Sequence, residues 1–232
     1  MAVQITRIRC SLVLLVGQHV DEHLNNLGIV SFPNLEHNIV TANTLYVVGN
    51  QKTNSKMMRA DFYTLRHSVL NFVKQKKRGQ NRKIPAELRS KLGVYYTSKE
   101  VEAIAKWNPY DFRSVGRFFD PEWMFGFSTF DIVIGNPPYV GHKGGQKTFF
   151  RDMKKTNLGQ KYSQERMDLF YYFFHVGIEI ANQNGIIAFL TTNYYPTVDS
   201  AVKLRTHIAS KTHPFLFVDF NEGYLFSSAR GQ

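Results

Sequence analysis

The strongest constraint on this fold is a short apolar run that ends abruptly in two prolines. Residues 130–134 read Phe-Asp-Ile-Val-Ile, and residues 135–139 read Gly-Asn-Pro-Pro-Tyr. An apolar run of this length suits a parallel strand that is covered on both faces. The prolines end the strand, because proline cannot donate a ladder hydrogen bond and its φ is fixed. The sequence therefore predicts that Asn136 lies at the carboxyl edge of a sheet, where open α/β folds bind ligands.

The residues after this strand suit a planar substrate that carries an amino group. The side-chain oxygen of Asn136 and the carbonyl oxygen of Pro137 are two acceptors that can take both hydrogens of an –NH2 group. Pro137 and Pro138 have no N–H group to compete with the substrate, and Tyr139 offers a ring on which a planar group can stack. The alternative is a Pro-Pro loop that only ends a strand, with Asn136 as an ordinary turn residue.

The second half of the chain alternates between helical and strand patterns. The apolar residues between 169 and 180 recur at largely helical spacing, and residues 186–191 form another short apolar run. Residues 201–209 read as an amphipathic helix, and residues 215–220 as a third strand. Strand, helix, strand, helix, strand is typical of a doubly wound parallel sheet. The fold class predicted from the pattern is α/β.

Composition agrees with one intracellular domain. With 232 residues, of which 43% are hydrophobic, the chain can bury a substantial core. One cysteine indicates a reducing compartment, and no apolar run reaches transmembrane length, so we expect a cytoplasmic protein without a membrane partner. The eight histidines and the cysteine show no metal-ligand spacing, so no metal is expected.

Residues 5–15 are similar to a helix lying on the sheet, although periodicity does not exclude a strand for their apolar end.

The tetrad Asn136-Pro137-Pro138-Tyr139 resembles the catalytic motif of adenine-N6 DNA methyltransferases, in particular those of type IIG restriction–modification systems. Further segments resemble the same enzymes in the same order, and the resemblance is weakest between residues 50 and 125. These segments are residues 32–36, 41–45, 167–173, 184–191, 219–222 and 225–232. Related enzymes that methylate glutamine amides or RNA bases carry similar tetrads.

The resemblance implies a role for each residue of the tetrad. Asn136 and Pro137 would accept hydrogen bonds from the amino group of the target adenine, and Pro138 completes the motif. Tyr139 would stack on the adenine after it is flipped out of the duplex. Phe226 would cover another part of the flipped ring; the alternative for Phe226 is a residue that plugs the sheet edge.

The resemblance also implies a bound S-adenosylmethionine. Asn43 would reach the adenine of this cofactor and Phe173 would pack against the same ring, with Phe170 on the same helix face as the other candidate. Asp168 is the third residue expected to bind the cofactor. Without the resemblance, Phe173 reads equally well as a core residue and Asn43 as a turn residue.

The charge of the chain indicates a polyanionic partner. The formal net charge is +11. The segment between positions 51 and 90 holds eleven Lys or Arg residues and only two acidic residues, Asp61 and Glu87, so its net charge is +9. Such a segment can bind phosphates in a salt-sensitive way. The alternative is a solvated helix and loop. Beside the resemblance, contact with double-stranded DNA is favoured, and the backbone contacts expected are Lys76, Lys77, Arg78, Arg82 and Lys83.

The resemblance further implies a Rossmann-like methyltransferase fold that is incomplete. The family carries a glycine-rich loop after the first strand and an acidic residue after the second, and neither is present here. We therefore expect residues 1–232 to be a partial catalytic domain, with 50–125 as a basic, partly helical insertion. The N-terminal strands and a target-recognition portion would belong to the rest of the enzyme.

The function expected from these features is site-specific adenine-N6 DNA methylation within a restriction–modification system, inactive or weak in this form. Two alternatives remain open: a DNA-binding remnant without catalysis, and a methyltransferase acting on a glutamine amide or an RNA base.

Overall fold

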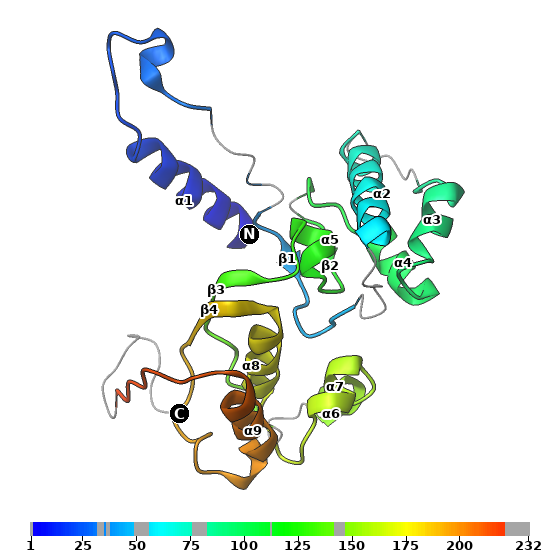
Figure 1. Ribbon diagram of the computed structural model, residues 1–232, viewed down its shortest axis with the longest axis vertical. Helices are drawn as coiled ribbons and strands as arrows, with labels where there is room; N and C mark the ends of the chain where they lie inside the picture. The colour runs from blue at the N-terminus through cyan, green and yellow to red at the C-terminus, as the bar shows by residue number, and fades with distance from the viewer. Residues whose placement is uncertain are drawn as a thin grey trace. The chain divides into compact units, whose positions relative to one another are not determined.

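The chain divides into two compact units. The computed structural model describes residues 2–31, 35, 38–48, 56–75, 83–111, 113–141 and 147–220. One unit comprises Met1–Asn43 and Val48–Gly126, and the other comprises Thr44–Val47 and Phe127–Gln232 (Figure 1). Whether residues 50–125 are an insertion within a single methyltransferase domain stays a prediction.

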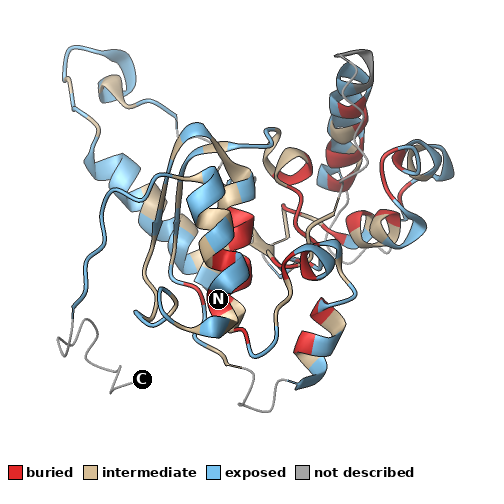
Figure 2. Cartoon of the chain, turned by 60° about the horizontal axis from the view of Figure 1, so that its bottom comes forward, coloured by how far each residue is buried: buried red, intermediate tan, exposed pale blue. Residues whose placement is uncertain are grey.

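The first unit is mainly helical. Its strands β1 (Thr41–Ala42) and β2 (Val115–Gly116) pair in parallel, with Thr41 opposite Val115. Its helices are α1 (Ala2–Val16), η1 (Asn25–Gly28), α2 (Lys56–Lys74), α3 (Ala86–Leu92), α4 (Ser98–Lys106) and α5 (Pro121–Phe125). The predicted helix at the chain start is confirmed as α1, and none of its residues is buried (Figure 2).

The core of the first unit lies around α5. Trp123 is fully buried and meets the rings of Phe62 and Tyr96 edge to face at 5.8 and 5.9 Å. The buried carboxylate of Asp120 accepts hydrogen bonds from the Tyr96 hydroxyl at 2.7 Å and from the backbone N–H of Trp123 at 3.1 Å. Asp120 thereby caps α5, whose first residue is Pro121, and a buried charge is satisfied in the process.

The second unit has α/β character with parallel strands, as the sequence predicts. Strand β3 (Phe130–Gly135) pairs with β4 (Ala181–Phe189), and α8 (Leu169–Ile180) precedes β4. The remaining helices are α6 (Lys147–Met153), α7 (Asn157–Tyr162), η2 (Asp199–Ala201) and α9 (Val202–Lys211). The predicted strand at 130–134 and the helices at 169–180 and 201–209 are confirmed as β3, α8 and α9. Strand β4 begins five residues earlier than its apolar run at 186–191.

Helix α8 covers one face of the β3–β4 pair. A Cβ atom at Gly177 would lie 2.8 Å from the ring of Phe189 and 3.6 Å from Val133. Glycine at this position therefore lets the helix approach both strands, because any larger side chain would collide with Phe189. The strand ends that carry the functional motif are held against α8 by this close packing.

Two predictions about the sheet are wrong. The first is that β3 is covered on both faces: Ile132 and Ile134 are 63% and 75% exposed, and Ile186 on β4 is 47% exposed. The second is a strand at residues 215–220, because the structure assigns none there and Phe215 is 79% exposed. Both errors have one cause. An apolar run predicts a buried strand only where other strands and helices cover it, and the sheet at β3 has only two strands within the described residues.

Among the described residues, no helix combines the length and the apolar character that crossing a membrane requires.

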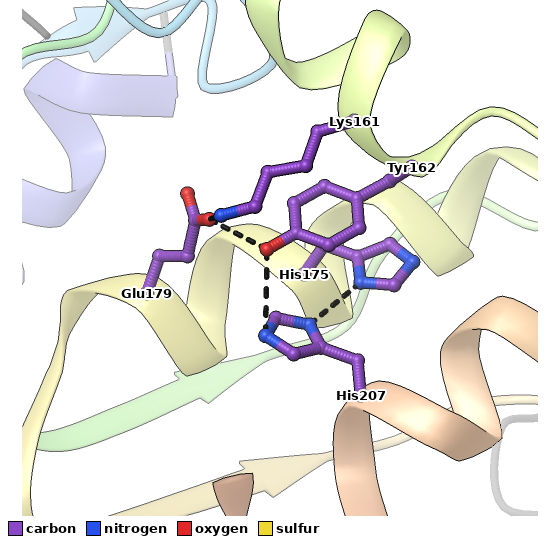
Figure 3. A network of polar contacts seen from close by, with 5 residues as sticks. All are labelled: Lys161, Tyr162, His175, Glu179 and His207. Atoms are coloured by element: carbon purple, nitrogen blue, oxygen red, sulfur yellow. Dashed lines mark hydrogen bonds and ion pairs between the residues drawn. The ribbon is translucent and has the colours of Figure 1, made fainter. Parts of the chain in front are cut away.

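A polar network joins helices α7, α8 and α9 (Figure 3). Glu179 accepts hydrogen bonds from Lys161 at 2.5 Å and from the hydroxyl of Tyr162 at 2.6 Å. The ring of Tyr162 stacks on His175 with centroids 3.8 Å apart. The Nδ1 atoms of His175 and His207 lie 2.8 Å apart. This contact needs one Nδ1 atom to donate and the other to accept, so it is lost if both rings are protonated.

The histidine pair predicts acid sensitivity. Burial, and then repulsion from His207 and nearby lysines, lowers the pKa of His175 to about 3. The unfolded chain takes up this proton near pH 6.5, so the stabilisation is complete above that pH and is lost as the pH falls. We expect the free energy of unfolding to fall by about 2 kcal/mol from this residue between about pH 7.5 and 5, measured by urea titration.

The control for this prediction is His175→Phe, which removes the titrating group and keeps a ring in the stack. The pH dependence should become flatter in this variant, whereas His19→Gln, at an exposed position, should retain the slope of the original chain. Equal slopes in the original chain and in His175→Phe would contradict the prediction.

Candidate active site at the ends of strands β3 and β4

The candidate site lies where the two parallel strands end. The N–H of Leu190 donates to the carbonyl oxygen of Gly135 at 3.0 Å, which extends the ladder by one step. Asn136 and Leu190 therefore follow the paired ends directly. An open depression of about 540 Å³ lies here, lined by Ile134, Gly135, Asn136, Ala188, Phe189 and Leu190. The depression is on the exposed face of the sheet, since Ile134 and Ala188 are exposed.

The hydroxyl of Tyr139 bridges the two strand ends. It donates to the side-chain oxygen Oδ1 of Asn136 at 2.7 Å and also lies 3.1 Å from the carbonyl oxygen of Leu190. One hydroxyl hydrogen thus faces two acceptors. A carbonyl-type oxygen can accept two hydrogen bonds, so Oδ1 of Asn136 keeps a second acceptor position. Burial raises the pKa of Tyr139, which keeps this hydroxyl protonated at neutral pH.

The two prolines differ in their surroundings. Pro137 is buried, whereas Pro138 is exposed. The carbonyl oxygen of Pro138 accepts a hydrogen bond from the N–H of Val140 at 3.1 Å. No described group donates a hydrogen bond to the carbonyl oxygen of Pro137. The acceptor assigned to Pro137 from the sequence is therefore available among the described residues, and that of Pro138 is engaged.

Phe170 forms the wall behind Tyr139. Its side chain is fully buried, and its ring meets that of Tyr139 edge to face at 6.4 Å. Its ring also contacts Tyr194 and Tyr195, which follow β4, at 6.1 and 6.3 Å. Phe173, the other candidate on α8, is only partly buried. Of the two phenylalanines considered, Phe170 is the one that packs against the tetrad.

Asp168 contacts both the loop that follows β3 and the loop that follows β4. It lies just before α8 and accepts a hydrogen bond from the hydroxyl of Tyr194. Burial, followed by this hydrogen bond, raises the pKa of Tyr194 to about 12. A Cβ atom at Gly141 would lie 2.7 Å from Oδ1 of Asp168, so glycine allows the loop after the tetrad to pass this carboxylate. The N–H of Leu169 also donates to the carbonyl oxygen of Val140 at 3.0 Å.

Two of the remaining predicted site residues, Asn43 and Lys83, belong to the first unit. Asn43 is exposed in the first unit, where its N–H donates to the carbonyl oxygen of Gly116 at 2.8 Å. Lys83 is exposed in the same unit. The predicted residues that lie outside the described residues are Lys76, Lys77, Arg78, Arg82 and Phe226. Their roles, and those of Asn43 and Phe173 in cofactor binding, stay predictions.

Sequence reasoning missed Leu190 and Tyr194. Leu190 acts through its backbone carbonyl, which no side-chain pattern reveals. Tyr194 falls just after the strand-like run at 186–191. The adjacent pair Tyr194-Tyr195, placed at the end of a predicted strand, is the feature of the sequence that could have indicated it. Across the part of the chain that the structure describes, no group of three or more His, Cys, Asp or Glu residues is placed to hold a metal ion.

Comparison with known proteins places this chain in a family. The family model of the Eco57I restriction-modification methylase matches residues 1–226. The chain therefore belongs to the Eco57I restriction-modification methylase family.

Individual relatives are distant and much longer. The type II methyltransferase M.HincII of Haemophilus influenzae is 27% identical over 97 residues, which are 42% of this chain and 19% of that protein. The type II restriction enzyme and methyltransferase RM.Eco57I of Escherichia coli is 20% identical over 99 residues, 43% of this chain and 10% of that protein. The matched segment thus spans about a fifth or less of these relatives.

Proposed function

We propose that this chain carries the catalytic motif of an adenine-N6 DNA methyltransferase of a restriction–modification system. The observation that carries the proposal is the placement of Asn136 at the end of β3, with Oδ1 held beside an open depression. Membership of the restriction-modification methylase family supports methyl transfer to DNA as the reaction. The choice of adenine rests on the resemblance of the tetrad.

The residues of the tetrad would act on the amino group of a flipped adenine. Its two hydrogens would bond to Oδ1 of Asn136 and to the carbonyl oxygen of Pro137. These acceptors draw the hydrogens away from the nitrogen and so raise its nucleophilicity. The ring of Tyr139, backed by Phe170, would stack on the base, worth about 1–3 kcal/mol per base. Most of the rate gain would come from orientation, which contributes about 7–11 kcal/mol in ideal geometry.

The methyl donor in this proposal is S-adenosylmethionine, which supplies a methyl group on a sulfonium. An open depression adjoins Asn136. It lies at the carboxyl ends of parallel strands, the edge at which Rossmann-like folds bind ligands. The residues proposed to hold the cofactor are Asn43, Asp168 and Phe173. The succession β3, α8 and β4 supports a Rossmann-like methyltransferase fold.

The proposal is tested first by titrating S-adenosylmethionine into the full 232-residue chain in a calorimeter. We expect saturable binding with a dissociation constant of about 1 μM to 1 mM, the usual range for enzyme substrates. S-adenosylhomocysteine should compete for the same site, and Asn136→Ala should bind the cofactor as well as the original chain does. If a chain shown to be folded by circular dichroism binds no cofactor, the chain alone is not a methyltransferase.

One observation favours a second candidate, a DNA-binding remnant without catalysis. The charge of +11 suits a polyanion whether or not the cofactor binds. DNA binding without cofactor binding would support this candidate over the first.

A further inference from the structure

Helix α6 carries a stripe of positive charge that the predicted DNA contacts do not include. Lys147 and Arg151 are exposed on α6, and the exposed Lys154 is the first residue after it, with its N–H donating to the carbonyl oxygen of Phe150 at 3.1 Å. The spacing of four and three residues therefore places the three cations on one side of this helical segment. Within the described residues, no carboxylate pairs with Lys147 or Lys154. The basic stripe, as we call Lys147, Arg151 and Lys154, begins eight residues after Tyr139 in the sequence.

Little negative charge offsets the basic stripe. Asp152 is the one acidic residue between positions 147 and 161, and it lies 3.2 Å from the ammonium of Lys155. Its distance to Nε of Arg151 is 3.9 Å, and the Arg151 side chain is 70% exposed. An ion pair of that length between exposed groups contributes little, so Arg151 is available to another anion.

Helix α6 also carries buried side chains beside the basic stripe. Phe150 is 2% exposed and Met153 is fully buried. The ring of Phe150 meets that of Phe149 edge to face at 5.8 Å. Helix α7 follows α6 after a short turn (Figure 1). Its Leu158 is also buried. The three cations are therefore carried by a packed helix, so little backbone order has to be gained when they bind an anion.

We propose that the basic stripe of α6 is a DNA-backbone contact of this chain. From Lys147 to Lys154, one residue past the end of α6, the backbone advances by about 10 Å, which matches about three phosphates of one strand at about 3.4 Å of axial rise each. The inference rests on the proposed function, because it takes double-stranded DNA as the partner. It adds a contact with the DNA backbone in the unit that carries Asn136 to the contacts predicted for the basic segment at 76–83.

The test is the salt dependence of DNA binding by the full chain. The probe is a labelled 30-base-pair duplex, and anisotropy gives the affinity between 50 and 200 mM NaCl. The variant replaces Lys147, Arg151 and Lys154 with glutamine. We expect the slope of log affinity against log salt to become shallower by about 2 to 3, because each lost phosphate contact accounts for about 0.9.

Two matched variants separate local contact from overall charge. The first replaces three other exposed cations, Lys99, Lys106 and Arg113, with glutamine, and should change the slope by less than about 0.5. The second is Lys147→Arg with Lys154→Arg, which keeps the charge and should keep the original slope. Thermal melts of all variants show whether α6 is still packed.

Each outcome decides a different point. If the two glutamine variants have equal slopes while the original chain binds DNA, the basic stripe is not a contact and the proposed function is unaffected. If the original chain does not bind the duplex at all, both the basic stripe and the DNA partner in the proposed function are overturned.

Discussion

Asn136→Ala should lower the rate of methyl transfer at least about 100-fold while leaving DNA affinity nearly unchanged. The substitution removes the side-chain oxygen proposed to accept a hydrogen of the adenine amino group, and the carbonyl of Pro137 remains as the only acceptor of the pair. Loss of one preorganised catalytic hydrogen bond costs about 10²–10³ in rate, and we expect a fall of at least about 100-fold. The measurement is transfer of labelled methyl groups to adenine-containing duplex DNA, followed by nucleoside analysis for N6-methyladenine.

Asn184→Ala is the matched control, because Asn184 is also exposed and lies on β4 away from the tetrad. It should leave the transfer rate unchanged. A rate in Asn136→Ala within a factor of ten of that of the original chain would remove the catalytic assignment. Methylation at a position other than N6 of adenine would keep the motif and overturn the specificity.

Phe170→Ala should destabilise the second unit strongly. Truncating a fully buried phenylalanine costs about 3–5 kcal/mol, because the transfer energy is lost and a cavity remains. Here the cavity would open among aromatic rings whose centroids lie 4.6 to 6.4 Å from that of Phe170, namely those of Tyr139, Tyr171, Phe174, Tyr194 and Tyr195. Denaturant unfolding followed by far-ultraviolet circular dichroism measures the loss.

Phe215→Ala supplies the control for this prediction, since Phe215 is 79% exposed and its truncation should change stability by less than about 0.5 kcal/mol. A loss below about 1 kcal/mol in Phe170→Ala would mean that the surrounding rings collapse into the space. The role of Phe170 as the wall behind Tyr139 would then be wrong.

The local structure of the second unit could be predicted from the sequence because its signals are local. Two prolines after an apolar run fix the end of β3, and helical spacing fixes α8 over residues 169–180. Burial could not be predicted in the same way, because it depends on which other elements pack there. Ile132 and Ile134 have the apolar character of a covered strand, yet their face of the sheet is open within the described residues.

The residues of the candidate site also fall into those that local sequence predicts and those that depend on packing. Asn136, Pro137 and Tyr139 are readable from residue type and order, since the chemistry lies in adjacent positions. Leu190 belongs to the site because of the register between β3 and β4, which brings its carbonyl oxygen within hydrogen-bonding distance of the hydroxyl of Tyr139, more than fifty positions away. The resemblance predicts that Asp168 binds the cofactor, which stays a prediction, and the structure adds that one oxygen of its carboxylate accepts a hydrogen bond from Tyr194. Such long-range pairs follow from how the strands and helix pack.

The open face of the β3–β4 sheet has a consequence for handling the protein in solution. Exposed apolar strands favour association between copies, and the net charge of +11 opposes it by mutual repulsion. Salt shortens the range of that repulsion, to about 8 Å at physiological ionic strength. The salt that would weaken the proposed DNA contacts also screens the repulsion between copies, so we expect both colloidal stability and DNA affinity to fall as the salt concentration rises.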